Sequence, residues 1–283
     1  MPELPEVQTI VDGLNKRVAG LKIVGAWFDW NKLKITEKSV GLTIQRVVRR
    51  GKNILFYLSD DKILLVHQKM TGHILVGKWK IDGRKIVPLA PESLKEKVNG
   101  YIHFILILDN GEMIGLSDLR KFAKAVFGPK KEIEDLPELK KLGPDALDSK
   151  LRVEGFAEKI KSRNKTIYQV LMDQTVIAGI GNIYSSDILW EGKVFPFKSA
   201  KKLSEEEIKR IYLAMKKVLK SALKLRGTSV SDYRDIDGKS GFYGDRRLVY
   251  KRERESCKRC GTKIIRSKKG GRSAYYCPNC QIQ

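Results

Sequence analysis

The sequence predicts an α+β protein with a β-rich N-terminal half, a mainly helical second half and a small metal-binding finger at the C-terminal end. Three observations support this fold class. Short apolar runs rich in β-branched and aromatic residues, separated by turn signals, recur between residues 21 and 127. After residue 150, apolar residues recur at helical spacing instead. All four cysteines lie in the last 27 residues, as two Cys-x₂-Cys pairs.

Length and composition limit the class of protein. A chain of 283 residues with 42% hydrophobic content suits two modest domains that each bury a core. No apolar run approaches the roughly 20 residues needed to span a bilayer. The N-terminal residues lack the basic and then hydrophobic pattern of a secretion signal. Because the cysteines are confined to one end, no disulfides are expected elsewhere, so we expect a cytoplasmic protein.

The charge balance indicates a polyanionic partner. Fifty-six Lys and Arg residues against 33 Asp and Glu residues leave a net charge of +23. Solubility does not require such an excess, and nucleic acid is the leading candidate partner. An anionic membrane surface is the alternative, but the sequence has no basic amphipathic helix with a bulky aromatic face.

The first elements are a helix and a series of strands. Apolar residues recur at helical spacing from Val7 to Val18, and Gly20 ends this helix. About eight short apolar runs follow, and their spacing suggests a sandwich or barrel. Strands are expected at residues 21–30, 42–48, 54–58, 63–66, 74–79, 102–108, 113–116 and 123–127.

The second half is predicted from helical periodicity and loop signals. Residues 88–100 are polar and predict a surface excursion, and the Pro- and Gly-interrupted residues 129–150 predict a linker. Ser204 and Glu207 form a capping box before a long helix. Other helices are expected at residues 153–161, 167–172 and after Asn182, with irregular structure at 229–244.

The cysteines predict a zinc site. Cys257 and Cys260 are separated by sixteen residues from Cys277 and Cys280. Four thiolates in two Cys-x₂-Cys knuckles form a closed tetrahedral site that holds a hairpin and carries out no chemistry. Iron or a redox pair is the alternative. Basic residues around the hairpin suit phosphate contact, with a solvated basic loop as the alternative: Lys263, Arg266, Lys268, Lys269 and Arg272.

The N-terminal stretch can make the chain terminus reactive. If Met1 is removed, Pro2 becomes a secondary amine with a pKa near the α-amino value of about 7.7–8, so a useful fraction is nucleophilic at neutral pH. Its attack on a sugar carbon gives an iminium directly, which promotes elimination. Glu3 and Glu6 place two carboxylates near this nitrogen. The alternative is that these residues and Pro5 only begin a helix and complement its dipole.

Three independent motifs, in this order along nearly the whole chain, resemble the formamidopyrimidine-DNA glycosylase and endonuclease VIII superfamily of base-excision repair enzymes. They are Pro-Glu-Leu-Pro-Glu-Val, the run Met-Asp-Gln-Thr-x-x-Ala-Gly-x-Gly-Asn-Ile-Tyr ending at Tyr184, and the four-cysteine finger. The resemblance implies a β-sandwich with an N-terminal catalytic helix at residues 1–128, and a linker at 129–150. A helix-two-turns-helix domain with a lesion loop would follow at 151–246, and a zinc-finger β-hairpin at 247–283.

The resemblance also implies roles for residues of the first half. Pro2 would displace the base at C1′ of the damaged nucleotide and form a Schiff base, while Glu3 would protonate the opening sugar ring. Glu6 would help to arrange that site. Lys52, in Arg-Arg-Gly-Lys at an expected hairpin turn, would contact a phosphate beside the lesion.

Further residues would hold the bent DNA. Asn182 and Arg272 match residues that bind the phosphates flanking the extruded nucleotide. Met70, Arg120 and Phe122 match the trio that fills the space left by the extruded base, where unstacking costs a few kcal/mol. Without the resemblance, Met70 and Phe122 would be interpreted as core residues at strand ends and Arg120 as a surface charge.

The lesion preference and the loop over the flipped base also follow from the resemblance. Leu4 and Met70 favour the branch that removes oxidised purines. Tyr168 stands where relatives usually have a lysine, which puts that preference in doubt. The loop would span residues 227–243, where glycines and hydroxyls suit a lid. Its candidate contacts are Thr228, Ser229, Ser231 and Tyr233.

We therefore expect a bifunctional DNA glycosylase and AP lyase. It would remove 8-oxoguanine and formamidopyrimidines from double-stranded DNA, act on abasic sites, and carry one structural zinc ion. A monomer associated with the nucleoid and not with a membrane is expected. The alternatives are an endonuclease VIII-like activity on oxidised pyrimidines and a damage-binding protein of the same fold without catalysis.

Overall fold

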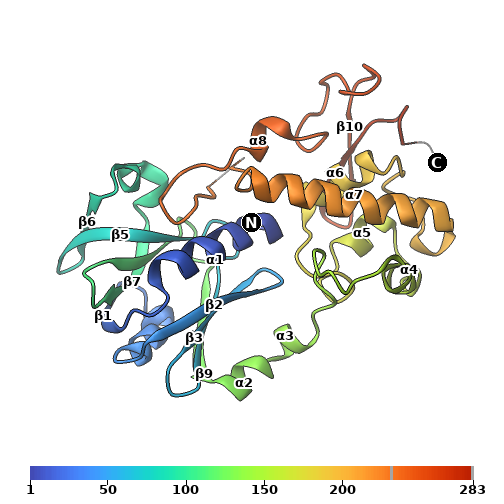
Figure 1. Ribbon diagram of the computed structural model, residues 1–283. Helices are drawn as coiled ribbons and strands as arrows, with labels where there is room; N and C mark the ends of the chain where they lie inside the picture. The colour runs from blue at the N-terminus through green and yellow to red at the C-terminus, as the bar shows by residue number, and fades with distance from the viewer. Residues whose placement is uncertain (230–231, 282–283) are drawn as a thin grey trace. The chain divides into compact units, whose positions relative to one another are not determined.

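The computed structural model describes residues 1–229 and 232–281 (Figure 1). The chain divides into two compact units, and each has its own hydrophobic cluster. The first unit comprises Met1–Lys140 and Leu225–Gly244, and the second comprises Lys141–Lys224 and Asp245–Gln283. The mixture of a β-sandwich, helices and a terminal hairpin confirms the predicted α+β class.

The first unit is a β-sandwich of two antiparallel sheets. Their strand orders are β1-β7-β8-β5-β6 and β2-β3-β4-β9. Side chains from both sheets, such as Phe56 and Phe104, meet in one buried core. The strands are β1 (Ile23–Phe28), β2 (Ile44–Arg50), β3 (Asn53–Leu58), β4 (Lys62–His67), β5 (His73–Asp82), β6 (Lys85–Ala90), β7 (Ile102–Leu108), β8 (Met113–Ser117) and β9 (Lys124–Pro129).

All the predicted strands are present, but β6 was not predicted. It takes the first residues of the expected polar excursion, and Pro88 lies opposite Trp79 of β5. Because β6 is the edge strand of its sheet, a proline can lie there without removing a ladder hydrogen bond. The rest of the excursion forms the 3₁₀ turns η2 (Glu92–Lys95) and η3 (Lys97–Asn99), and Leu94 packs with Trp79 and Ile105.

Helix α1 (Leu4–Val18) lies against the sandwich (Figure 1). Glu3 is its N-cap and Pro5 lies in its first turn, which confirms the helix start predicted from Pro5, Glu3 and Glu6. One face carries buried apolar residues that join the sandwich core, and each such burial contributes roughly 1.5–3 kcal/mol. These residues are Val7, Ile10, Val11, Leu14 and Val18. The helix therefore anchors the chain terminus to a rigid body.

The segment 225–244 belongs to the first unit, whereas the sequence placed it with the helical domain at 151–246. Tyr233 and Ile236 are buried in the sandwich core, and the Val76 N–H of β5 donates to the Ile236 carbonyl at 2.7 Å. The described residues of this segment, 225–229 and 232–244, have little regular structure. Its sequence therefore carries no periodic signal that would assign it to either unit.

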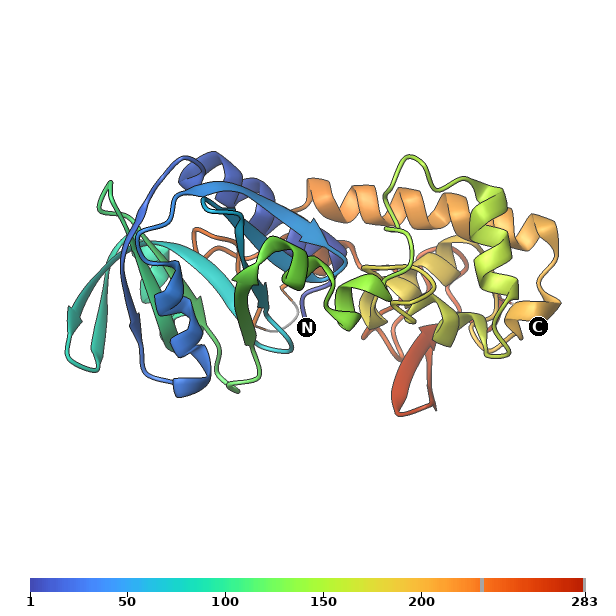
Figure 2. The ribbon, with the colours of Figure 1, turned by 90° about the horizontal axis from the view of Figure 1, so that it is seen from below.

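The second unit is mainly helical and ends in a hairpin (Figure 2). The Ser204 N–H donates to Glu207 Oε2 at 2.8 Å and the Glu207 N–H to Ser204 Oγ at 3.2 Å, which confirms the predicted capping box. Its elements are α4 (Val153–Lys161), α5 (Ile167–Leu171), α6 (Asn182–Glu191), η4 (Ala200–Lys202), α7 (Glu205–Lys224), β10 (Ile265–Lys269) and β11 (Arg272–Tyr276). The remaining short helices of the chain are η1 (Asn31–Ser39), α2 (Lys130–Glu134), α3 (Pro137–Lys140) and α8 (Tyr243–Arg246).

Candidate active site

The start of α1 places two carboxylates at the chain terminus. Pro2, Glu3 and Glu6 are all buried. The Glu3 N–H donates to Glu6 Oε2 at 2.8 Å, and the Thr228 N–H donates to Glu6 Oε1 at 2.8 Å. The two oxygens of Glu6 therefore connect the first turn of α1 to the 225–244 segment.

Lys52 reaches the site from the β2–β3 hairpin. Arg50 pairs with Asn53, so Gly51 and Lys52 form a two-residue turn. Gly51 has a φ of 59°, a conformation that glycine adopts without strain. The Lys52 side chain is buried although it carries a charged group.

The electrostatics of the terminal nitrogen show which groups surround it. Burial lowers the pKa of the Met1 α-amino group, the Glu3 and Glu6 carboxylates oppose this decrease, and Lys52 adds to it. The structure therefore brings together four of the predicted catalytic groups: the N-terminal stretch with Pro2, both carboxylates, and Lys52. A terminal amine in this environment loses its proton more readily than one in water.

His67, at the end of β4, is a neighbour of Lys52 that sequence reasoning missed. Burial, together with the nearby Lys69 and Lys52 charges, lowers the pKa of His67 to about 3. The Lys69 N–H donates to His67 Nδ1 at 3.0 Å, so the imidazole is neutral with its proton on Nε2. The sequence signal was only its position in the run His-Gln-Lys-Met70.

One buried carboxylate organises the two loops that carry the predicted void-filling side chains. Asp118 accepts hydrogen bonds from the N–H groups of Phe122 at 2.8 Å and Arg120 at 3.3 Å. Thr71, next to Met70, donates its hydroxyl to the same carboxylate. Because both loops bind Asp118, the spacing of their tips is restrained. An acid between a strand and a turn was the sequence signal for this role.

The three void-filling candidates are on the surface. Met70 is 44% exposed and Phe122 is 45% exposed, so neither is a core residue. The Arg120 guanidinium lies 4.5 Å from the centre of the Phe122 ring, within the range of a cation–π contact. Exposed apolar side chains on anchored loop tips are suited to insertion between bases, although their role stays a prediction.

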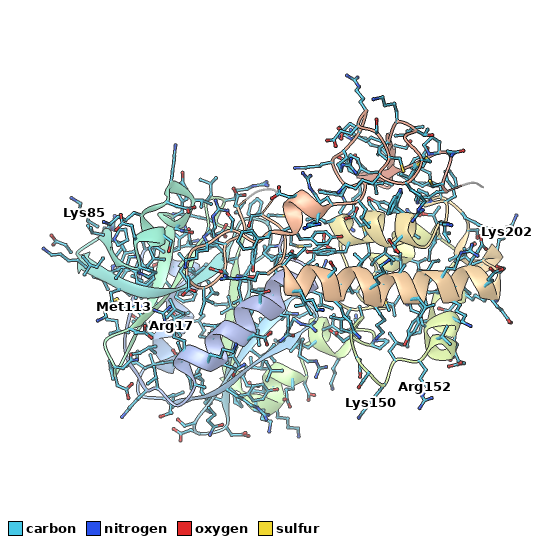
Figure 3. All side chains as sticks on the ribbon, turned by 45° about the horizontal axis from the view of Figure 1, so that its top comes forward. Arg17, Lys85, Met113, Lys150, Arg152 and Lys202 are labelled. Atoms are coloured by element: carbon cyan, nitrogen blue, oxygen red, sulfur yellow. The ribbon has the colours of Figure 1, made fainter. Side chains whose placement is uncertain are left out.

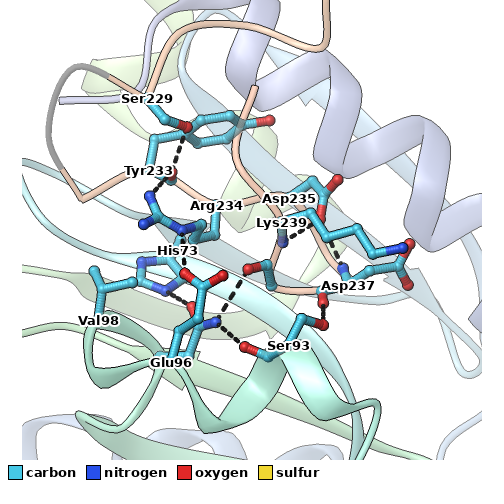
Figure 4. Close-up of polar contacts among 12 residues, drawn as sticks. His73, Ser93, Glu96, Val98, Ser229, Tyr233, Arg234, Asp235, Asp237 and Lys239 are labelled. Carbon is cyan, nitrogen blue, oxygen red and sulfur yellow. Dashed lines mark hydrogen bonds and ion pairs between the residues drawn. The ribbon is translucent and has the colours of Figure 1, made fainter. Parts of the chain in front are cut away.

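The 225–244 segment is fastened to the β-sandwich by polar contacts (Figure 4). His73 Nε2 lies 2.9 Å from Asn99 Oδ1, and Asn99 Nδ2 donates to the Gly238 carbonyl at 3.1 Å. Arg234 Nε donates to Glu96 Oε2 at 3.0 Å. Sequence reasoning missed these anchors, because buried polar residues far apart in the sequence leave no periodic pattern.

Three of the four residues predicted to contact the flipped base from the loop lie within the part of the chain that the structure describes. The Ser229 hydroxyl donates to the Tyr233 carbonyl at 2.7 Å, and the Tyr233 hydroxyl lies 3.4 Å from the Glu6 carbonyl. Burial, together with the nearby Glu6 charge, raises the pKa of Tyr233, so its hydroxyl remains a donor. Thr228 contacts Glu6 through its backbone, whereas Ser231 lies outside the described residues.

The two predicted phosphate-binding residues of the second unit are linked within that unit. Asn182 begins α6 after the N-cap Gly181, and Arg272 begins β11 on the exposed edge of the finger hairpin. The buried hydroxyl of Tyr168 donates to Asn182 Oδ1 and, at 2.7 Å, to the carbonyl of Ser273, the neighbour of Arg272. Asn182 is therefore connected to the strand that carries Arg272.

The four cysteines form a site that fits one zinc ion. The Sγ atoms all lie within 4.8 Å of one another, with Cys257 and Cys280 at 4.0 Å and Cys260 and Cys277 at 3.4 Å. A tetrahedral ZnS₄ centre with Zn–S bonds of about 2.3 Å has sulfur separations of about 3.8 Å. The Trp190 indole N–H donates to Cys257 Sγ at 3.3 Å, as expected for a thiolate ligand. Four protein ligands leave no position for substrate.

The basic residues of the finger differ in what they contact. Arg266 is engaged within the finger, because its Nε donates to Ser273 Oγ at 3.1 Å and its Nη1 lies 3.6 Å from Glu253 Oε1. Lys268 and Arg272 are exposed on the hairpin. The basic side chains of the finger therefore differ in how readily they can bind a phosphate. Of the three, Arg266 is the least suited, because it already has partners within the finger.

Removal of the zinc is expected to unfold the finger and to weaken DNA binding. Structural zinc contributes on the order of 10 kcal/mol to such small domains, and the cluster around Cys257 and Cys277 is the core of the finger. We expect one zinc ion per chain in a colorimetric release assay, and Cys277→Ser should lower both this stoichiometry and the affinity for duplex DNA. Ser256→Ala, beside a ligand but outside the sulfur cluster, should change neither. Full affinity without zinc would contradict a structural role.

Charged side chains extend outward over the surface, as Lys150, Arg152 and Lys202 illustrate (Figure 3). Their phosphate-binding capacity accords with the net charge of +23. Among the described residues, no helix is both long enough and apolar enough to cross a bilayer.

Three family models match successive parts of the chain. The N-terminal domain of formamidopyrimidine-DNA glycosylase matches residues 1–125, and the H2TH domain of the same family matches residues 142–234. A zinc finger found in this family and in isoleucyl-tRNA synthetase matches residues 255–282. The three matches occur in the same order as the sandwich, the helices and the finger.

Known proteins resemble the chain over its whole length. A curated formamidopyrimidine-DNA glycosylase of Desulforamulus reducens is 35% identical, with 99% of each chain covered. A structure of the Lactococcus lactis Fpg protein with DNA containing an abasic site is 30% identical, with a TM-score of 0.86 and coverage of 99% and 100%. The same Lactococcus protein with DNA containing an oxidised pyrimidine has a TM-score of 0.85, 30% identity and complete coverage of both chains.

Proposed function

Because the chain belongs to the formamidopyrimidine-DNA glycosylase family, we propose that it removes oxidised purines from DNA and then cleaves the strand. Its substrates would be 8-oxoguanine and formamidopyrimidines in duplex DNA, together with abasic sites. The observation that supports this proposal best is the burial of Pro2 at the start of the chain, with Glu3, Glu6 and Lys52 as the charges near the terminal nitrogen.

Chemistry begins at the Pro2 nitrogen once Met1 has been removed. The nitrogen forms a bond to C1′ as the bond from C1′ to the base breaks, and the base leaves with the electron pair and takes up the proton that the nitrogen loses. Glu3 donates a proton to O4′, so the sugar ring opens and an iminium forms between C1′ and nitrogen. Glu6 holds the first turn of α1 in place through its contact with the Glu3 N–H.

The iminium is an electron sink that drives two eliminations. It acidifies the C2′–H bond, and loss of that proton expels the 3′ phosphate in β-elimination. A second proton loss expels the 5′ phosphate in δ-elimination, which leaves a one-nucleotide gap flanked by phosphates. The closed zinc site supplies no step of this sequence, because its ligand set leaves no open position.

The remaining site residues would hold the DNA in its reactive shape. Lys52, Asn182 and Arg272 would bind phosphates around the extruded nucleotide, while the exposed Met70 and Phe122 would fill the space in the stack. Arg120 would donate hydrogen bonds to the orphaned base, and the loop at residues 227–243 would close over the extruded one. The high positive charge supports association with the nucleoid, and the protein would act there as a monomer.

A trapping assay with a panel of lesions tests the proposal. Sodium borohydride reduces an iminium to a stable amine, so lesion DNA should become covalently attached to the protein. We expect trapping on duplexes with 8-oxoguanine, formamidopyrimidine or an abasic site, and none on undamaged DNA. Binding to each lesion duplex without any trapping would instead show a damage-binding protein.

Oxidised pyrimidines are the second candidate substrate class. The Lactococcus lactis relative has been crystallised with DNA containing an oxidised pyrimidine. The same panel separates the two classes when purine and pyrimidine lesions are tested in parallel. Faster single-turnover release of oxidised pyrimidines than of 8-oxoguanine and formamidopyrimidine would assign this chain to the second class.

A further inference from the structure

Tyr168 lies at a junction inside the second unit. It is the second residue of α5 and is completely buried. Its hydroxyl contacts two segments that are far apart in the sequence: the side-chain oxygen of Asn182 at the start of α6, and the carbonyl of Ser273 in β11. These segments carry the two residues to which phosphate binding is assigned in this unit, Asn182 and Arg272.

The structure places the side-chain oxygen of Asn182, and not its amide nitrogen, against the Tyr168 hydroxyl. A tyrosine hydroxyl has one proton, which the Asn182 and Ser273 oxygens share as acceptors. With its oxygen held by Tyr168, the Asn182 amide has the Nδ2 hydrogens as its remaining polar group. Phosphate oxygens only accept hydrogen bonds, so this is the orientation that phosphate binding requires.

Gln169 of α5 and Met172, the C-cap of that helix, also contact the finger hairpin. Gly270 lies at the hairpin turn, where an added Cβ would be 2.9 Å from Gln169 Nε2. Arg272 Nη1 donates to Met172 Sδ at 3.4 Å. The turn of the hairpin is therefore packed closely against α5, and Tyr168 joins this packed hairpin to the start of α6.

We propose that Tyr168 is a positioning residue that sets the Asn182 amide and the β11 strand in one rigid phosphate-binding arrangement. This inference rests on the proposed function, because it takes Asn182 and Arg272 as phosphate ligands.

A double-mutant cycle tests the inference. The measured quantity is the Kd for a duplex with a tetrahydrofuran abasic analogue, which requires no catalysis. Tyr168→Phe removes only the hydroxyl and should weaken binding about three- to tenfold, the effect of one hydrogen bond. Asn182→Ala should weaken binding at least as much. In the Asn182→Ala background, Tyr168→Phe should change the Kd less than twofold, because the group it positions is already gone.

Matched variants separate positioning from general stability. Tyr212→Phe makes the same change in the same unit, where the hydroxyl donates to the Leu151 carbonyl at 2.8 Å. Both phenylalanine variants should lower Tm similarly, but only Tyr168→Phe should lower DNA affinity. Tyr168→Lys should recover affinity relative to Tyr168→Phe, because an ammonium can donate to both oxygens.

The outcomes distinguish this inference from the proposed function. Additive effects of Tyr168→Phe and Asn182→Ala, or unchanged affinity in Tyr168→Phe, would overturn the positioning role while borohydride trapping continues to support the glycosylase. Unchanged affinity in Asn182→Ala would show that Asn182 does not bind phosphate, and it would overturn the inference as well. Absence of trapping in the unaltered protein would overturn the proposed function itself.

Discussion

Replacing Pro2 with glycine is expected to slow borohydride trapping on lesion DNA by on the order of 10²-fold, the effect of a misplaced reacting group. Glycine leaves a primary amine, which forms a neutral imine that must still be protonated. Its backbone is also less restricted, so the nitrogen is held less well against C1′. DNA affinity should be nearly unchanged, because Pro2 is buried at the start of α1 and carries no phosphate-binding side chain. Single-turnover trapping rates with excess protein provide the measurement.

Pro5→Ala is the matched control for this experiment. Pro5 lies in the first turn of the same helix and is also buried, but its nitrogen is an internal amide. Trapping should persist in this variant with at most a small loss of stability. Intact mass is measured on each sample, since the Pro2 nitrogen is reactive only after Met1 has been removed. An active sample that retains Met1 on every molecule would exclude Pro2 as the nucleophile.

Trapping should also depend on pH in a defined direction. In the chain that retains Met1, burial lowers the pKa of the Met1 α-amino group, with Glu3 and Glu6 opposing and Lys52 reinforcing this effect. We expect the same groups to act in the same direction on the Pro2 amine, because Pro2 is itself buried beside them. The unprotonated, nucleophilic fraction therefore increases as pH rises through that lowered pKa, and it reaches its plateau at a lower pH than for an amine in water. The rate of borohydride trapping on abasic DNA, measured over a range of pH, should rise and level off with the unprotonated fraction of the amine.

Glu3→Gln is expected to slow base release by about 10²–10⁴-fold, the usual contribution of a general acid or base. The amide has nearly the same shape, so α1 should still form, but it cannot transfer a proton to O4′. The Kd for abasic-analogue DNA should stay within a few-fold of that of the unaltered protein. Base release measured in a single turnover on a formamidopyrimidine duplex, beside the Kd, separates chemistry from binding.

Asp12→Asn makes the same chemical change on the same helix. Asp12 is exposed and accepts a hydrogen bond from Gln8 at 2.7 Å, away from the chain terminus. Base release should be unaffected in this variant. Equal losses in Glu3→Gln and Asp12→Asn would point to the stability of α1 as the cause and would remove Glu3 from the proton transfer.

Local patterns predicted most of the fold because their physical causes are local. The helix that begins at Leu4 follows from its apolar spacing and from the capping residues Glu3 and Glu6. The zinc site follows from the Cys-x₂-Cys spacing, which brings sulfur ligands together within each knuckle. By contrast β6, with Pro88, was hidden, because only its position at a sheet edge makes the proline acceptable.

The amino-acid sequence by itself determined the order of elements, the metal ligands and the family, and it predicted a reactive terminus, since each depends on residue type and short spacing. Only the tertiary structure revealed that Glu6 binds Thr228, that Asp118 holds two loops, and that Tyr168 joins Asn182 to β11. These contacts bring together buried polar groups that are distant in the chain. Such groups need hydrogen-bond partners once water is excluded. A local sequence pattern does not identify the partner, because tertiary packing determines which buried polar groups come into contact.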